Sequence, residues 1–219
     1  ARGAQAPAYG MLDGMSGELT WGPPDEIDPD RPDILVKGTL RHGLRIVIRP
    51  LRPEDRAELA EGFEGLSERS RYLRFLTGKG TLSERGLDKL VDQVDGHDHV
   101  ALALWWVRRS RSDILLGDAR FIRLPYDPEC ADVAVAIADE IHGQGAATLM
   151  LAVLKERALE EGIHRFSAVM SPENEASHRM IQRLGRVLKD EYVDGTREIE
   201  VDLDGEPLDR PPRPERPGV

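Results

Sequence analysis

The amino-acid sequence predicts one α/β domain within a chain of 219 residues. Strand patterns and helix patterns alternate through the middle of the chain, as they do in α/β proteins. A glycine-rich loop separates one strand pattern from the helix pattern behind it, and 40 % of the residues are hydrophobic, which supplies a core. We expect the folded domain at residues 41–205, with a flexible, acidic and proline-rich arm at 1–40 and a disordered tail at 206–219.

The domain is expected to open with one strand and three helical segments. β-branched residues in partial alternation indicate a strand at 44–49. Pro53 and the acidic residues behind it open a helix that ends at Leu66, because the first helical turn accepts proline and favours negative charge. Two further helices, at 67–76 and 83–94, each start at a serine.

Strands and one long helix make up the expected centre of the domain. Strands at 100–107 and 114–124 are joined by a short charged loop, and Gly117 indicates a bulge in the second of them. Residues 133–137 alternate branched side chains with alanine, which indicates a strand with two unlike faces. A helix at 146–161 follows, with an apolar stripe along one side.

A strand, a helix and a hairpin are expected to complete the domain. Residues 166–170 have a strand pattern, and residues 174–184 have the pattern of a helix that is capped at its start. Strands at 186–192 and 197–203 then surround Asp194-Gly195, a strong signal for a two-residue turn.

The composition restricts the classes of function. A formal net charge of -10 argues against nucleic acid as a partner, because phosphate contacts require clustered Lys and Arg. The same charge suits a cationic substrate, and the alternative is that it serves solubility alone. No apolar run is near the roughly 20 residues that span a bilayer, so no membrane segment is expected. Cys130 is the sole cysteine, which makes a thiolate-rich metal site unexpected. Without a secretory signal pattern, the expected location is cytoplasmic.

The loop before the long helix carries the clearest chemistry. Small residues let a ligand approach the backbone, and the free N–H groups and partial positive charge of a helix N-terminus attract phosphate. The spacing matches neither the Walker pattern nor the dinucleotide fingerprint. Taken alone, the loop indicates either a phosphate site or a tight turn. Its residues are His142, Gly143, Gln144, Gly145, Ala146 and Ala147.

The order of elements between residues 44 and 203 resembles the GNAT family of acetyltransferases. At this loop the family carries Gln/Arg-x-x-Gly-x-Gly/Ala. Gly145 and Ala147 match the fourth and sixth positions of that pattern, whereas His142 replaces the first. The resemblance implies a GNAT fold: a mixed, mostly antiparallel sheet of about six or seven strands, flanked by helices, with two central parallel strands splayed apart. It also implies acetyl-CoA as the cosubstrate and no metal.

The same resemblance implies further cofactor contacts. The family has an Asn before a helix that ends in Leu/Phe-Gly, so Asn174 is expected at the pantetheine arm, with Ser177 one turn along the same face. The alternatives are that Asn174 only supports the helix start and that Ser177 is a surface residue. The backbone of Val135, Ala136 and Ile137 is expected to pair with the pantetheine amides as an added strand would.

Acetyl transfer to an amine is expected to need a base. Only roughly one in 2,500 lysine side chains is neutral at pH 7, since the ordinary pKa is about 10.4. Asp132 is the first candidate because it shares a strand face with small alanines; a solvated strand-end acid is the alternative. Glu140 is the second candidate, and Ile181 occupies the position where several GNAT enzymes carry a tyrosine acid. The weaker candidates are His99, His142 and Cys130.

Residues 48–55 and 66–75 are similar to the start of the acetyltransferase domain of bacterial protein-lysine acetyltransferases. This similarity implies transfer of an acetyl group to a primary amine, with a protein lysine as one acceptor, and it puts Asp132 in the region where those enzymes carry a catalytic acid. Two alternatives stay open: a small-molecule amine as the acceptor, or an acyl-CoA-binding regulatory module with weak catalysis. A homodimer through the final hairpin also stays open.

Overall fold

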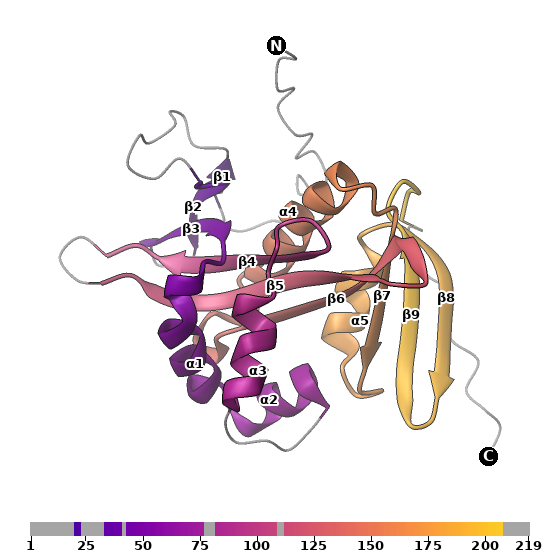
Figure 1. Ribbon diagram of the computed structural model, residues 1–219, viewed down its shortest axis with the longest axis horizontal. Helices are drawn as coiled ribbons and strands as arrows, with labels where there is room; N and C mark the ends of the chain where they lie inside the picture. Colours follow the sequence, from indigo (N-terminus) through magenta and orange to yellow (C-terminus); the bar gives the residue numbers. More distant parts are fainter. Residues whose placement is uncertain (1–19, 23–32, 41–42, 77–81, 109–111, 208–219) are drawn as a thin grey trace, which may run out of the picture.

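The computed structural model describes residues 20–22, 33–40, 43–76, 82–108 and 112–207 (Figure 1). The described strands are β1 (Thr20–Gly22), β2 (Val36–Leu40), β3 (Leu44–Pro50), β4 (His99–Trp106), β5 (Ile114–Leu124), β6 (Asp127–Ile137), β7 (Arg165–Met170), β8 (Arg186–Val193) and β9 (Thr196–Asp202). The helices are α1 (Arg56–Gly65), α2 (Glu68–Phe75), α3 (Glu84–Leu87), α4 (Ala146–Glu160) and α5 (Glu175–Gln182), with short helical turns at Pro53–Asp55, Asp88–Asp92 and Asp139–Ile141. None of the helices in these ranges is long and apolar enough to cross a membrane.

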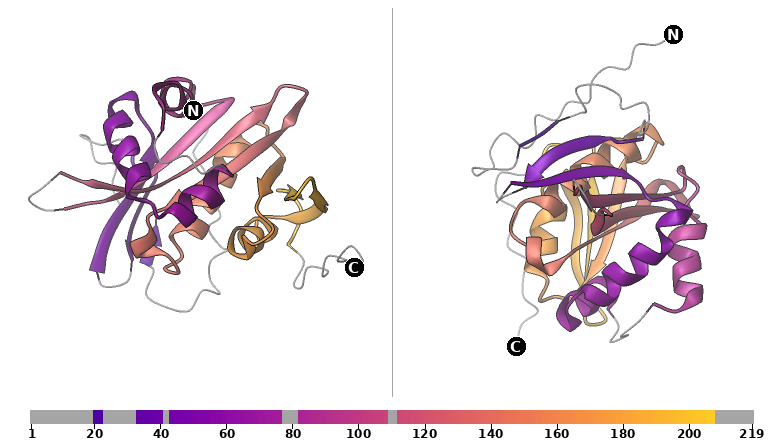
Figure 2. Two further views of the ribbon diagram at one scale, coloured as in Figure 1. Left: turned by 90° about the horizontal axis from the view of Figure 1, so that it is seen from below. Right: turned by 90° about the vertical axis from the view of Figure 1, so that its left-hand side faces the viewer.

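All nine described strands belong to one sheet, in the order β1-β2-β3-β4-β5-β6-β7-β9-β8. β6 and β7 run parallel, and the other described neighbours pair antiparallel. The β1–β2 edge and the β8–β9 hairpin therefore lie at opposite ends of the sheet (Figure 2). This mixed, mostly antiparallel sheet with flanking helices confirms the predicted fold class.

The N-terminal edge of the sheet extends beyond the seven strands that the sequence predicts. Val36–Leu40 falls in the expected arm, yet it pairs with β3 along its whole length and buries Val36 and Leu40. The intervening Lys37, Gly38 and Thr39 give no strand pattern of their own, so β2 depends on its pairing with β3. Most of the remaining arm, and residues 208–219 of the expected tail, lie outside the described residues.

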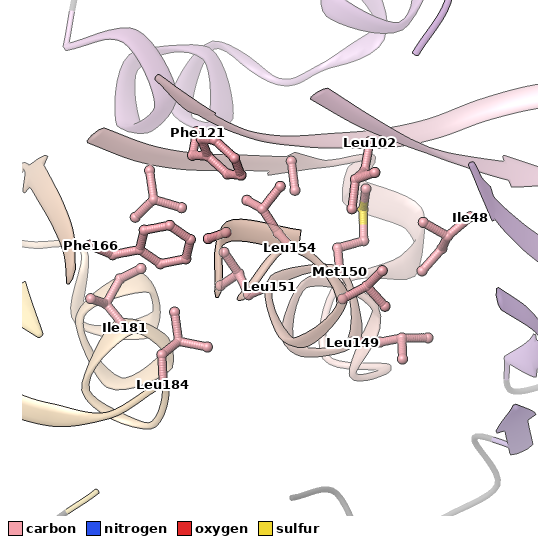
Figure 3. Close-up of a cluster of buried hydrophobic side chains, with 14 of the residues drawn as sticks. Ile48, Leu102, Phe121, Leu149, Met150, Leu151, Leu154, Phe166, Ile181 and Leu184 are labelled. Atoms are coloured by element: carbon pink, nitrogen blue, oxygen red, sulfur yellow. The ribbon is translucent and has the colours of Figure 1, made fainter. Parts of the chain in front are cut away.

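Helices cover both faces of the sheet. Ile48 and Leu102 belong to a first apolar cluster, whereas their neighbours in the strands, Val47 and Ala101, belong to a second. Because successive side chains of a strand point to opposite faces, the two clusters lie on opposite faces of the sheet. α1 covers the second cluster through Leu59. α4 and α5 cover the first, and Figure 3 shows their side chains directed toward the strands. From α4, the fully buried residues are Leu149, Met150, Leu151, Leu154 and Ala158.

Two predictions that depend on glycine are confirmed. The register between β4 and β5 shifts beside Gly117, and a Cβ on that glycine would lie 2.6 Å from the carbonyl oxygen of Ala136. Glycine is therefore required for β5 and β6 to approach at this bulge. In the last hairpin, Asp194 and Gly195 have φ values of 47° and 82°, as a two-residue turn between twisted strands requires.

A buried ion-pair cluster fixes α5 against the last hairpin. Arg197, only 2 % exposed, donates two hydrogen bonds to the Asp190 carboxylate, at 2.7 and 2.9 Å. His178 on α5 contacts the same carboxylate through Nε2 at 3.0 Å. Burial alone would raise the pKa of Asp190, but the bonds from Arg197 and His178 hold it below its usual range. α5 is thereby held beside β7, where it forms part of the site.

Candidate active site

The parallel strands β6 and β7 pair over only a short stretch. Their register runs from Cys130↔Arg165 to Asp132↔Ser167 and then stops, although both strands continue. Beyond this point β6 pairs only with β5, and β7 only with β9, among the described residues. The inner edge of each strand is thus left without a strand partner, which agrees with the expected splay of the two strands.

The separated strands open into a cavity of about 580 Å³, within the usual range for a small-molecule or cofactor site. It is bounded by α2, β6, the glycine-rich loop, β7 and α5. The expected cofactor residues that line it are Val135, Ala136, Ile137, His142, Gly143, Gly145, Ala146, Ala147, Asn174 and Ser177. Gln144 does not line it; its side-chain amide is directed to the carbonyl oxygen of Glu140, 3.5 Å away.

The glycine-rich loop places a helix N-terminus at the cavity. Gly143 and Gly145 adopt φ values of 72° and 84°, which side-chain-bearing residues rarely adopt. α4 begins directly after Gly145, without a side-chain cap and without an acidic residue in its first turn. The N–H groups of this first turn are therefore available to an anion, and the helix dipole favours one there.

His142, which departs from the family pattern, has a structural contact. Its Nε2 lies 2.9 Å from the carbonyl oxygen of Ile137, so this nitrogen carries the proton and donates to the end of β6. Its Nδ1 is 3.7 Å from a carboxylate oxygen of Asp139. The imidazole thus holds the loop against the strand that precedes it, while the backbone of the loop stays open to the cavity.

Asn174 caps a helix and also lines the cavity. Its Oδ1 accepts a hydrogen bond from the Ser177 N–H at 3.1 Å, so it caps α5. Asn174 and Ser177 are both half-buried and both line the cavity. Ser177 is therefore part of the cavity wall, and Asn174 supports the helix start while facing the cavity.

Asp132 occupies the last residue pair before β6 and β7 separate. It is not among the residues that line the cavity, but it shares a strand face with Ala134 and Ala136, which do. The side chain is exposed, yet the protein around it displaces enough water to raise the pKa of the carboxyl. A hydrogen bond with Ser167 acts in the opposite direction, and the nearby Glu198 carboxylate adds to the increase.

The remaining base and nucleophile candidates lie outside the cavity lining. Glu140 is exposed and sits in the Asp139–Ile141 turn. Burial raises the pKa of the Cys130 thiol to about 11, which leaves it protonated at neutral pH. Burial and the adjacent Arg120 lower the pKa of His99, away from the cavity on β4. Among the described residues, no group of three or more His, Cys, Asp or Glu side chains is placed to hold a metal ion.

The contribution of α2 to the cavity was not predicted. Arg69, Ser70 and Leu73 of this helix line one side, and Arg179 of α5 and Arg183, the residue directly after α5, line another. These two arginines are four residues apart, a spacing that the sequence does reveal. Nothing in the sequence indicates that α2, which precedes the loop by about 70 residues, reaches this cavity.

Comparisons with known proteins agree with this geometry. A family model described as an acetyltransferase (GNAT) domain matches residues 45–187. Acetyltransferase Pat of Mycolicibacterium smegmatis is 28 % identical over 148 residues, which are 68 % of this chain and 43 % of that protein. An acetyltransferase of Pseudomonas aeruginosa is 29 % identical over 161 residues, 74 % of this chain and 85 % of that protein. The GNAT domain of S. lividans PAT superposes with a TM-score of 0.66 at 26 % identity, covering 76 % of this chain and 96 % of that one. The match thus spans less than half of the Mycolicibacterium relative.

Proposed function

The chain belongs to the GNAT acetyltransferase family, and from this premise we propose that it transfers the acetyl group of acetyl-CoA to the Nζ amine of a protein lysine. The single observation that carries the proposal is the cavity between the separated strands β6 and β7, which ends at the open N-terminus of α4. The similarity of residues 48–55 and 66–75 to bacterial protein-lysine acetyltransferases supports a lysine as the acceptor.

In this proposal acetyl-CoA lies along the inner edge of β6. Within the segment Val135, Ala136 and Ile137, the backbone groups that face this inner edge pair with the pantetheine amides, as in strand addition. The pyrophosphate lies at the loop of Gly143 and Gly145, where the N–H groups of α4 and the helix dipole favour negative charge. These contacts direct the thioester toward the point at which β6 and β7 separate.

The chemical step is direct attack by a neutral amine. Asp132 accepts the proton of the lysine Nζ, directly or through one water, and the Nζ lone pair forms the new bond to the thioester carbonyl carbon. Backbone N–H groups of β6 stabilise the oxyanion of the tetrahedral intermediate. Its collapse breaks the C–S bond and releases CoA as a thiolate, which needs no dedicated acid because an ordinary thiol pKa is about 8.5.

The surface beside Asp132 supports a polypeptide acceptor. Ile122 on β5 lies directly opposite Asp132 and is 46 % exposed, and Val169 on β7 is 47 % exposed. These apolar side chains stand on the same open sheet face as the Asp132 carboxylate. An extended lysine-bearing peptide could cover them while its cationic side chain approaches Asp132, whereas a small diamine would leave them exposed.

We expect lysine-bearing peptides to be better acceptors than small amines. For wild-type protein, kcat/KM for a peptide with apolar residues flanking its lysine should exceed kcat/KM for free lysine or a short diamine by about tenfold or more, because burial of Ile122 and Val169 adds binding energy. The check is CoA release with each acceptor at fixed acetyl-CoA concentration. An Ile122→Asp variant, at a position outside the cavity lining, should reduce the preference. Equal or better turnover of small amines by wild-type protein would identify a small-molecule acetyltransferase instead.

A further inference from the structure

α2 forms a wall of the cavity although it is distant in sequence from the other walls. Leu66, just before the helix, and Arg69, Ser70 and Leu73 within it line the cavity. The helix is only 8 residues long, and Glu68, Arg69 and Tyr72 within it are exposed. An isolated helix of this length is not stable in water, so its position depends on contacts with the rest of the domain.

One carboxylate supplies several of these contacts. Asp139, in the turn between β6 and the glycine-rich loop, accepts the Ser67 backbone N–H at Oδ2 (2.7 Å). Its Oδ1 accepts the hydroxyls of Ser70 (2.6 Å) and Ser67 (3.2 Å). Burial alone would raise the pKa of Asp139, but these hydrogen bonds hold the pKa below its usual range, so the carboxylate stays ionised at neutral pH.

The Asp139 contact differs from an ordinary helix cap. Ser67 already caps α2 from within, since its hydroxyl oxygen accepts the Ser70 N–H at 3.2 Å. Asp139 adds hydrogen bonds to Ser67 and Ser70 from outside the helix. It lies in the Asp139–Ile141 turn, which directly precedes the glycine-rich loop. The same carboxylate faces His142, which is bonded to the end of β6. The N-terminus of α2 is thus tied to the segment that carries the loop.

Arg69 is the cationic residue that α2 contributes to the cavity wall. It lies two residues after Ser67, lines the cavity and is exposed, and no hydrogen bond or ion pair joins its guanidinium to another described residue. Guanidinium groups form short, charge-assisted hydrogen bonds with phosphate, often in pairs. A cation without a partner among the described residues, in the same cavity as the uncapped N-terminus of α4, is suited to a phosphate of the ligand.

We propose that Asp139 is a positioning residue for the cosubstrate: its carboxylate docks α2 on the turn before the glycine-rich loop, and so directs Arg69 toward the phosphates of acyl-CoA. This deepens the proposed function at the cosubstrate site and rests on the acyl-CoA cosubstrate of the family, not on the identity of the acceptor. It predicts that Asp139 affects recognition of the phosphate-bearing part of CoA and leaves the pantetheine part unaffected.

The test is binding of CoA and of pantetheine, which has no pyrophosphate or adenosine phosphates, measured without any acceptor. We expect Asp139→Ala to raise the Kd for CoA about tenfold, by loss of one charge-assisted contact, and to change the Kd for pantetheine by less than about twofold. Arg69→Ala should raise the Kd for CoA by the same factor. The double variant should bind CoA no more weakly than either single variant, because both substitutions remove the same contact. Asp139→Asn, which keeps one acceptor oxygen, should lie between wild type and Asp139→Ala.

Asp95→Ala is the matched control, because Asp95 also accepts several N–H groups, those of His97, Asp98 and His99, in a loop outside the cavity lining. It should change neither Kd by more than about twofold. An equal increase of both Kd values in Asp139→Ala would show a general distortion of the cavity and overturn the proposal. Additive effects of Asp139→Ala and Arg69→Ala would overturn it as well. Arg69→Ala alters an exposed side chain, so the comparison stands even if Asp139→Ala does not fold.

Discussion

Asp132→Ala is expected to lower kcat at pH 7 by about 100-fold, within the range that a general base contributes, while the KM for acetyl-CoA changes by less than about twofold. The carboxylate lies outside the cavity lining, at the point where β6 and β7 separate, so its loss removes no cosubstrate contact. Steady-state kinetics with a lysine peptide provide the check. Asp132→Glu should retain most of the activity, whereas unchanged kcat in Asp132→Ala would remove this residue from the mechanism.

The role of Asp132 as the base also predicts how kcat/KM depends on pH. Only the ionised carboxylate can accept a proton, so kcat/KM should rise as pH increases through the pKa of Asp132, which desolvation holds above that of an ordinary aspartate. The hydrogen bond with Ser167 lowers this pKa. Ser167→Ala should therefore move the acidic limb of the pH profile to higher pH. A limb that shifts to lower pH, or does not move, would show that another group is titrating.

Gly145→Asp is expected to abolish detectable binding of acetyl-CoA, with an increase in Kd of about 100-fold or more. An aspartate here would place a negative charge beside the ligand's pyrophosphate at the start of α4, in a backbone conformation with φ of 84°. The strain costs about 1–2 kcal/mol, which is less than the roughly 5–15 kcal/mol that stabilises a typical domain, so most of the fold should persist. Titration calorimetry with acetyl-CoA measures the loss directly.

Gly162→Asp is the matched control for backbone strain. Gly162 follows α4, has a φ of 74° and is not among the residues that line the cavity. A Cβ there would meet no atom within 4 Å, and its φ is close to the 84° of Gly145. Both variants therefore place a side chain on a backbone with positive φ, and they differ in their distance from the cavity. Both should lower the melting temperature by a few degrees, and Gly145→Asp alone should lose acetyl-CoA binding. Equal affinity in the two variants would exclude the loop as the phosphate site.

Features encoded by neighbouring residues could be predicted from the sequence. The Asp194-Gly195 turn, the bulge at Gly117 and the cap formed by Asn174 each depend on local backbone conformation. β2 could not be predicted in this way, because its strand conformation comes from pairing with β3. The sequence pattern also did not indicate that β6 starts at Asp127, because Pro128 and Glu129 are residue types that are uncommon in strands. This part of β6 continues the hairpin with β5.

The same distinction between local features and long-range contacts applies to the candidate site. The residues of the glycine-rich loop are contiguous, and the chemistry of a helix N-terminus is a property of that short segment, so its place at the cavity could be expected. The contact between Asp139 and Ser70 joins residues 69 positions apart. Such a contact depends on how α2 packs against β6, and no spacing in the chain reports it. Arg69 was therefore not recognised as part of the cavity wall.

The most direct test of the account is whether acetyl-CoA bound by this chain is transferred to a lysine amine. Wild-type protein is mixed with acetyl-CoA and a peptide with one lysine, and free CoA and peptide mass are followed together. We predict one acetyl group on the lysine Nζ for each CoA released, no acetylated protein intermediate, and about 100-fold slower transfer by Asp132→Ala. Tight binding of acetyl-CoA without transfer to the peptide or to a panel of small amines would contradict the account and identify an acyl-CoA-binding regulatory module.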